Sequence, residues 1–351
     1  MNKNRKILSS FIFILFLFTL VYNISKADND IKNNISRNSF GKISIIGFKS
    51  DSYLNEIEMI YDSDKFKVKE KDSKLNRVKN DNSNKKNDNL YKEINKIISE
   101  ETKNLDGNWQ VAVDSIRGKS NISIERKSSP KNINQTSAST IKIFIGIEAY
   151  RQVEEGILSE NDVEEDIYLM LRNSDNEATD RLIDLIGDNN IDKSSKNVGR
   201  TIYKITGKNR TGLYTKMNQI GKRNVANAKD LNKGLIAIYN GKIVNEAHSK
   251  KMIKAMANNT TTSKFKLLEK LPKGAIGLNK SGEYLDGGIE NDAAIIDVGD
   301  SIFAISFMGE YPGPVSHKYG EQAIAMQNLG KRISEAYIKF DKNKEWFKFL
   351  I

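Results

Sequence analysis

The order in which helix-like and strand-like segments follow one another constrains the fold of this chain more than any other feature of its sequence. Apolar residues recur at helical spacing in some segments and alternate in others, which predicts helices and strands respectively. The predicted strands are 109–114, 121–126, 292–296 and 301–308, and the predicted helices lie near 90–98, 139–153, 167–171, 178–186 and 321–340. This order predicts an α+β fold, an α/β sandwich whose antiparallel sheet is formed by both chain ends and carries an inserted all-helical subdomain. Gly187 is expected to close the helix over residues 178–186.

The first 27 residues are typical of a segment that directs export. Three basic residues precede an apolar run over residues 7–24, and Ser25-Lys26-Ala27 follows with the small residues that signal peptidase requires. The run approaches the length of a membrane span, so an uncleaved N-terminal membrane anchor is the alternative to a cleaved signal peptide. In either case we expect the rest of the protein to be secreted or extracytoplasmic, anchored through residues 7–24 if the segment is retained.

Residues 28–89 differ in composition from the rest of the chain. They are rich in Asn, Asp, Lys and Ser and end in a low-complexity run over residues 79–88. Such a segment buries too little apolar surface to fold by itself, which predicts a polar, largely flexible tether. Alternating apolar residues predict one small hairpin within it, over residues 41–68. We expect one globular domain over residues 90–351.

The absence of cysteine and the scarcity of histidine narrow the possible chemistry. No cysteine occurs, which excludes disulfides, thiolate metal sites, a cysteine nucleophile and a lipid-modified N-terminal cysteine. His248 and His317 are the only histidines. Two histidines are too few to favour a multi-histidine metal centre, and we expect both side chains at the surface. The sequence therefore predicts no metal or other cofactor.

The charge balance indicates which large partners the chain would attract. The net charge is +11, and it falls to +7 when residues 1–27 are removed. A basic exported protein is attracted to anionic surfaces, so we expect the anionic cell envelope as a partner. Nucleic acid is not expected, because basic and acidic residues are interspersed and no stripe of aromatic and basic residues occurs.

Ser139-Thr140-Ile141-Lys142 fits the pattern S-x-x-K at the start of the predicted apolar helix over residues 139–153. One helical turn brings the lysine amine beneath the serine hydroxyl, and burial beside a second cation would keep that amine uncharged and basic. The same pattern occurs in polar segments at Ser39/Lys42, Ser83/Lys86, Ser128/Lys131 and Ser263/Lys266. Only Ser139 begins an apolar helix, whose N-terminus favours developing negative charge.

Two further motifs follow, Ser174-Asp175-Asn176 and Lys280-Ser281-Gly282, and each occurs once. The three motifs resemble the S-x-x-K, S-D-N and K-T-G elements of class A β-lactamases and penicillin-binding proteins, in the same order and with a similar separation of 106 residues between Ser174 and Lys280. The resemblance extends from Leu90 to the C-terminus. It includes the stretches Ala178-Thr179, Val225 to Gly241, and Glu290-Asn291-Asp292-Ala293.

The resemblance implies catalytic roles for four of these residues. Ser139 would attack a carbonyl carbon to form an acyl-enzyme, Lys142 would accept the serine proton, and Ser174 would pass a proton to the leaving nitrogen. Lys280 would keep Lys142 uncharged. Each residue also has a structural interpretation, with Ser174 as a helix N-cap, Lys280 as a solvated strand residue and Lys142 as a helix lysine that reaches solvent.

The resemblance also implies a substrate-binding set. Asn176 would contact the substrate and brace the site, Lys280 would attract a substrate carboxylate, and Ser281 would donate a hydrogen bond to that carboxylate. The backbone N–H groups of Ser139 and Glu283 would form an oxyanion hole. The implied substrate is a β-lactam or a peptidoglycan-like acyl compound.

The sequence departs from class A β-lactamases in the loop that carries their deacylating glutamate. This loop is expected near residues 205–220, and residues 193–229 contain no Asp or Glu. Asn209, Asn218 and Gln219 cannot replace the missing base, since amides do not titrate near neutral pH. We therefore expect an exported serine hydrolase or acyltransferase that is acylated at Ser139 and deacylates slowly. The alternatives are a β-lactamase that uses a carboxylate from elsewhere and a non-catalytic cell-wall-binding or sensor domain.

Overall fold

The computed structural model describes residues 81–217, 219, 223–241, 244–259, 265–316 and 318–342. The expected signal segment, the predicted hairpin over residues 41–68 and His317 lie outside these residues. None of the described helices is both long and apolar enough to cross a membrane.

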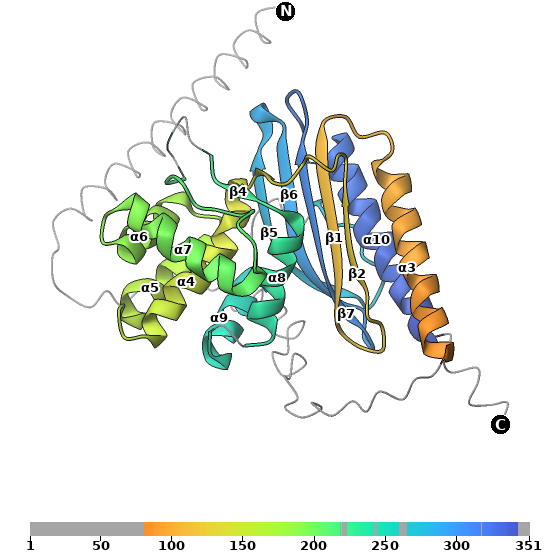
Figure 1. The fold of residues 1–351 in the computed structure, drawn as a ribbon, viewed down its shortest axis with the longest axis horizontal. Coiled ribbons are helices and arrows are strands. Elements are labelled where there is room, and N and C mark those ends of the chain that lie inside the picture. The colour runs from red at the N-terminus through yellow and green to blue at the C-terminus, as the bar shows by residue number, and fades with distance from the viewer. Residues whose placement is uncertain are drawn as a thin grey trace, which may run out of the picture. The chain divides into compact units, whose positions relative to one another are not determined.

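A five-stranded antiparallel sheet forms the centre of the described domain, in the order β2-β1-β7-β6-β5 (Figure 1). The strands are β1 (Asn108–Arg117), β2 (Ser123–Lys127), β5 (Ile276–Tyr284), β6 (Ile289–Asp297) and β7 (Ile302–Glu310). β1 pairs with β7, so strands from both ends of the domain complete one sheet. The predicted fold class is therefore confirmed, and β5 lies at the edge of the sheet.

A helical subdomain is inserted between β2 and β5, as predicted. It contains the 3-10 turn η2 (Ala138–Ile141) and the helices α4 (Lys142–Glu154), α5 (Glu160–Arg172), α6 (Asn176–Gly187), α7 (Ile191–Thr206), α8 (Ala228–Tyr239) and α9 (Glu246–Ala257). A two-stranded sheet of β3 (Gln135–Thr136) and β4 (Val225–Ala226) links its start to its middle. α4 is buried along most of its length, so residues at its N-terminus are shielded from water.

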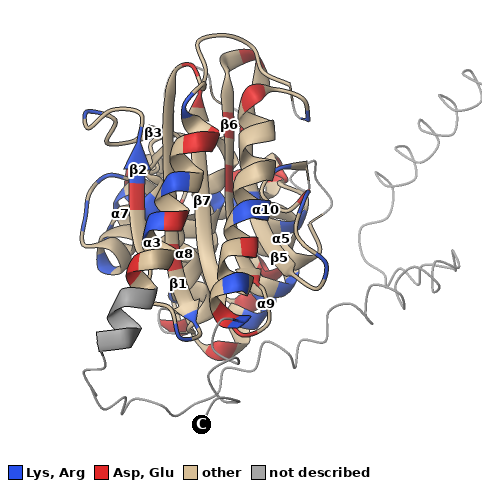
Figure 2. Cartoon of the chain, turned by 90° about the vertical axis from the view of Figure 1, so that its right-hand side faces the viewer, with Lys and Arg blue, Asp and Glu red and all other residues tan. Residues whose placement is uncertain are grey.

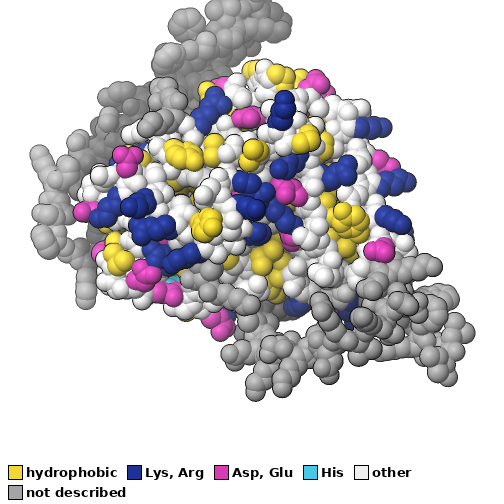
Figure 3. Space-filling view, in the orientation of Figure 1, with side chains coloured by type: hydrophobic (Ala, Val, Ile, Leu, Met, Phe, Trp, Pro, Cys, Tyr) yellow, Lys and Arg dark blue, Asp and Glu magenta, His cyan; other side chains and the backbone are white. Residues whose placement is uncertain are grey.

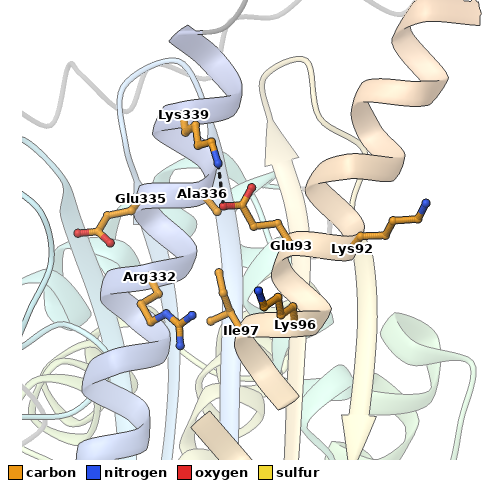
Figure 4. Close-up of a pocket in the computed structure, with 8 residues that line it drawn as sticks. All are labelled: Lys92, Glu93, Lys96, Ile97, Arg332, Glu335, Ala336 and Lys339. Atoms are coloured by element: carbon orange, nitrogen blue, oxygen red, sulfur yellow. Dashed lines mark hydrogen bonds and ion pairs between the residues drawn. The ribbon is translucent and has the colours of Figure 1, made fainter. Parts of the chain in front are cut away.

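Helices cover both faces of the sheet. α3 (Asp81–Thr102) and α10 (Glu321–Lys342) lie side by side on one face, and the helical subdomain lies on the other (Figure 1). Successive residues of β6 are therefore buried in different cores: Ala293 and Ile295 beneath the subdomain, Ala294 and Ile296 beneath α3 and α10. Acidic and basic residues are interspersed on α3 and α10 (Figure 2). A groove between these helices is lined by both signs of charge, with Lys339 paired to Glu93 (Figure 4).

Three element boundaries differ from the predictions. α3 begins at Asp81, within the segment predicted as a tether, and from Leu90 onward its buried residues pack in the core that also contains α10. The serine motif begins in the turn η2, and α4 itself starts at Lys142. α6 is followed by the left-handed residue Asp188 (φ 56°), whereas Gly187 is buried against Ser194 and leaves no room for a side chain.

Candidate active site

The Lys142 amine is buried at the start of α4 and donates hydrogen bonds to the segment that links α5 to α6. Its Nζ lies 2.7 Å from the Ser174 carbonyl oxygen, 3.3 Å from Ser174 Oγ and 2.7 Å from Asn176 Oδ1. The side chain is fully buried, so the interpretation of Lys142 as a lysine that reaches solvent is wrong. The first two sequence motifs are in direct contact.

The Lys280 amine approaches the same serine from β5. Its Nζ lies 2.9 Å from Ser174 Oγ and 2.8 Å from the Ser281 carbonyl oxygen. Lys280 is fully buried, which rules out its interpretation as a solvated strand residue. The Ser174 hydroxyl therefore lies between two lysine amines, and a hydroxyl can both accept and donate a proton.

Burial and mutual repulsion make both amines weaker bases than an ordinary lysine. Burial, together with the charge of Lys280, lowers the pKa of Lys142 from 10.5 to about 6, although Asp175 and Asp180 oppose the shift. Burial lowers the pKa of Lys280 to about 7, against the effect of acidic neighbours. At neutral pH Lys142 is mainly an uncharged amine, which is the form that can accept a proton.

An uncommon backbone conformation aims the Ser174 carbonyl group at Lys142. Ser174 has a φ of 57°, in the left-handed region that few residues other than glycine adopt. The N-cap of α6 is Asp175, whose Oδ1 accepts a hydrogen bond from Ala178 N at 2.7 Å. The interpretation of Ser174 as an N-cap is therefore wrong. Backbone strain of this kind persists where the surrounding contacts require it, and here the carbonyl and hydroxyl oxygens of Ser174 both contact lysine.

Ser139 lies on η2, which packs directly against Gly282 in β5. A side-chain carbon at position 282 would lie 2.7 Å from Ser137 O and 2.8 Å from Ser139 N, closer than such contacts occur. Glycine at this position thus allows the edge strand to approach the backbone of Ser139. Asn291 on β6 holds the preceding loop in place, since its Nδ2 donates to the carbonyl groups of Thr136 and Ser137 at 2.9 and 3.0 Å. All three sequence motifs therefore meet at the end of β5 beside α4 and α6.

Lys266 is a buried lysine that the sequence did not reveal, and it contacts acidic side chains of β5 and β6. Lys266 Nζ lies 3.0 Å from Glu283 Oε2 and 3.6 Å from Glu290 Oε1, and Lys266 is fully buried. In the sequence it stands out only as part of a coincidental S-x-x-K pattern. The signal that could have found it is the pair Glu290 and Asp292 within an otherwise apolar segment, because carboxylates in a strand buried on both faces need partners.

The acid-free loop follows α7, which extends to Thr206 and so takes up the first two residues of the predicted loop. Two acidic residues on α6 contact this loop. Asp180 Oδ1 accepts a hydrogen bond from Met217 N at 2.7 Å, and Asp184 lies 2.6 Å from Lys216 Nζ. The Asp180 carboxylate near Lys142 is thereby engaged with the backbone of the loop.

His248 is buried, contrary to the expectation that it lies at the surface. Its ring stacks on Tyr150 at 4.2 Å, and its two nitrogens lie 3.1 Å from Glu154 Oε1 and 3.1 Å from Glu160 Oε1. Two carboxylates and an aromatic face supply the partners that allow a histidine to be buried. Within the described ranges no group of His, Asp and Glu is arranged to hold a metal ion.

Comparison with known proteins agrees with this fold. The sequence profile of the β-lactamase enzyme family matches residues 159–337, slightly more than half of the chain. No curated protein sequence matches. Among solved structures, PBP-A is 18% identical with a TM-score of 0.57, over 72% of this chain and 96% of PBP-A.

Two β-lactamase structures are similarly related. A β-lactamase from Xanthomonas campestris is 18% identical with a TM-score of 0.58, over 71% of this chain and 98% of that enzyme. A class A β-lactamase from Mycobacterium abscessus is 17% identical with a TM-score of 0.57, over 71% of this chain and 99% of that enzyme. A mutant of PBP-A has been solved as an acyl-enzyme complex with penicillin G. The extent of the family match and the shared fold show that this chain belongs to the β-lactamase enzyme family.

Proposed function

We propose that this protein is an exported serine hydrolase or acyltransferase that forms an acyl-enzyme at Ser139 and releases it slowly. The observation that carries the proposal is the buried pair of amines, Lys142 and Lys280, which share the Ser174 hydroxyl beside the turn that bears Ser139. Membership of the β-lactamase family supports a serine acyl-enzyme, and the arrangement of these residues supports the individual roles.

The acylation step would use the uncharged amine of Lys142 as a base. Lys142 follows Ser139 by three residues at the junction of η2 and α4, a spacing that places side chains on the same side of a helical turn. As the bond between Ser139 Oγ and the carbonyl carbon forms, the serine proton passes to Lys142. When the bond from carbon to the leaving nitrogen breaks, Ser174 gives its proton to the nitrogen and regains one from the neighbouring ammonium group.

The oxyanion of the tetrahedral intermediate would be bound by the N–H groups of Ser139 and Glu283. The close approach of β5 to η2 at Gly282 supports this role, because the two backbones come into contact next to both donors. One donor of this kind contributes about 3 kcal/mol to transition-state stabilisation. Asn176, which accepts a hydrogen bond from Lys142 at 2.7 Å, would brace the amine and border the substrate.

Slow deacylation follows from the composition of the loop after α7. No acid occurs between residues 193 and 229, and the nearby Asp180 carboxylate already accepts the Met217 N–H. Water that enters the site would therefore lack a carboxylate base. A β-lactamase with a base from elsewhere and a non-catalytic cell-wall-binding or sensor domain remain the competing functions.

Fluorescent penicillin tests these functions. We expect stable labelling of the wild-type protein and none of the Ser139→Ala variant, because the acyl bond forms to the Ser139 hydroxyl. Ser128→Ala, which removes the serine of another S-x-x-K pattern in the same chain, should label like the wild type. Intact-protein mass spectrometry measures the mass and lifetime of the adduct, and peptide mapping locates it. Transient labelling would support the β-lactamase alternative, and absence of labelling the non-catalytic one.

The pH dependence of acylation should report the unusual basicity of Lys142. The base acts only when uncharged, and its pKa is lowered to about 6. The acylation rate should therefore rise about tenfold per unit below pH 6 and level off above about pH 7. An ordinary lysine would give a rate that still increases at about pH 9. Stopped-flow labelling across this range, with the folded state checked at each pH, distinguishes the two outcomes.

We also propose export and contact with the anionic cell envelope. The N-terminal basic and apolar residues support export, through a cleaved signal peptide or an anchor over residues 7–24. Basic side chains gather over the helical subdomain (Figure 3), and the exposed face of α7 contributes Lys196, Arg200 and Lys204. Such a face would be attracted to anionic polymers or lipids. Separation of membrane and medium fractions, followed by detection of the protein, tests the localisation.

A further inference from the structure

Acidic side chains line the face of β5 that points away from Lys142. Ser281 and Glu283 alternate with Lys280 and Gly282 along the strand, so the two pairs point to opposite faces. Lys280 and Gly282 face Ser174 and η2. The cross-strand partners of Ser281 and Glu283 on β6 are Asp292 and Glu290. Three carboxyl groups of the described strands thus surround the Ser281 side of β5.

Among the described residues, Lys266 forms ion pairs with two of these carboxyl groups. Lys266 is fully buried, 3.0 Å from Glu283 and 3.6 Å from Glu290. Neither carboxylate oxygen of Glu290 has a hydrogen-bond partner within the described part of the chain. Asp292 accepts hydrogen bonds from Asn279 Nδ2 and Leu267 N, and the positive charges of Lys266 and Lys280 also act on it.

The lysines on the opposite face offset only part of this excess at neutral pH. The pKa of Lys142 is lowered to about 6 and that of Lys280 to about 7, so both amines lose positive charge where ordinary lysines retain it. Burial raises the pKa of Asp292 to about 6 and of Glu290 to about 7, so Asp292 stays mainly ionised at neutral pH whereas Glu290 is partly protonated. A carboxylate that approached the Ser281 side of β5 would meet negative charge.

Glu283 is the member of this group that a substrate can reach. Its side chain is 24% exposed, whereas the side chains of Lys266 and Glu290 are 0% exposed. It directly follows Lys280-Ser281-Gly282, on the edge strand along which a substrate acylating Ser139 would lie. A bound substrate therefore passes within reach of the Glu283 carboxylate.

We propose that Glu283 selects substrates by charge, so that the part of the substrate lying beside Ser281 and Glu283 carries an ammonium group or an uncharged amide, and not a carboxylate. This inference rests on the proposed acyl transfer at Ser139. It replaces the carboxylate-binding role that the resemblance implied for Lys280 and Ser281. The physical basis is that like charges in a poorly solvated site repel, whereas a donor or cation gains a partner.

Three probes that share one lactam and one acyl group test the proposal. Benzylpenicillin carries a carboxylate, its methyl ester is neutral, and its diethylaminoethyl ester is cationic. We expect the second-order rate of Ser139 acylation to increase in this order, by about tenfold from the anion to the neutral ester. Glu283→Gln should reduce the ratio of the neutral-ester rate to the anion rate, and this ratio is compared within each variant so that a general effect on acylation cancels. Glu335→Gln on α10 removes one exposed charge and is the matched control.

A second variant should change the selectivity between the probes in the opposite direction. Lys266→Met removes the ammonium group that pairs with Glu283 and Glu290, and it should widen the preference against the anion. Thermal unfolding is used to confirm the folded state. A wild-type protein that prefers the anion, or a Glu283→Gln variant with unchanged selectivity, would overturn the inference while leaving acyl transfer intact. If none of the three probes acylates Ser139, the proposed function fails and the inference fails with it.

Discussion

Replacement of Lys142 by methionine is expected to slow acylation of Ser139 by roughly 10²–10⁴-fold, which is the usual contribution of a general base. Methionine has nearly the length of the lysine chain and suits the fully buried position. The decrease in acylation rate therefore measures the loss of the amine, without a contribution from a new cavity. The remaining slow reaction should also lose its dependence on a group with a pKa of about 6. Stopped-flow labelling with fluorescent penicillin between about pH 5 and pH 9 measures both effects.

The control for this variant is Lys204→Met, which removes a charge from the exposed face of α7. It should acylate at the wild-type rate with the same pH profile. Thermal unfolding of both variants shows whether the fold is retained, since the Ser174 carbonyl group and Asn176 lose a donor when Lys142 is replaced. An unchanged acylation rate in folded Lys142→Met would rule out Lys142 as the base.

Met217→Glu is expected to convert slow release of the acyl group into turnover. The Met217 N–H donates to Asp180, and the charge of Asp180 acts on Lys142, so position 217 lies beside the helix face that bears the site. The Met217 side chain is partly buried against the main core. A carboxylate on this side chain would give water a base, and we expect deacylation to accelerate by roughly 10²–10⁴-fold.

Met217→Gln provides the matched comparison, because glutamine has the shape of glutamate without a group that titrates near neutral pH. Only the glutamate variant should shorten the lifetime of the adduct in mass spectrometry and show steady-state hydrolysis of a chromogenic cephalosporin. The new carboxylate should also raise the pKa of Lys142 and move the rise in acylation to higher pH. Equal adduct lifetimes in the two variants would show that position 217 does not face the acyl carbon.

Much of the architecture could be predicted because a strongly periodic pattern of apolar residues indicates whether a segment forms a helix or a strand. The alternating strand over residues 109–114 and the amphipathic helix over residues 321–340 lie within elements of the expected kind. The apolar strand predicted over residues 301–308 matches β7 apart from Ser301. α7, α8 and α9 were not predicted as helices, and of β5 only the motif Lys280-Ser281-Gly282 stood out. β5 has few apolar residues to mark it, because polar side chains occupy both of its faces where it borders the site.

The sequence by itself determined the order of the three motifs, the family resemblance and the absence of an acid in the loop after α7. Only the tertiary structure decided that Lys142 and Lys280 contact one serine, that burial makes both amines weak bases, and that Lys266 lies between Glu283 and Glu290. The physical reason is that a pKa depends on the water and the charges that surround a group. Those surroundings are set by helix packing and by strand register, which join residues far apart in the sequence.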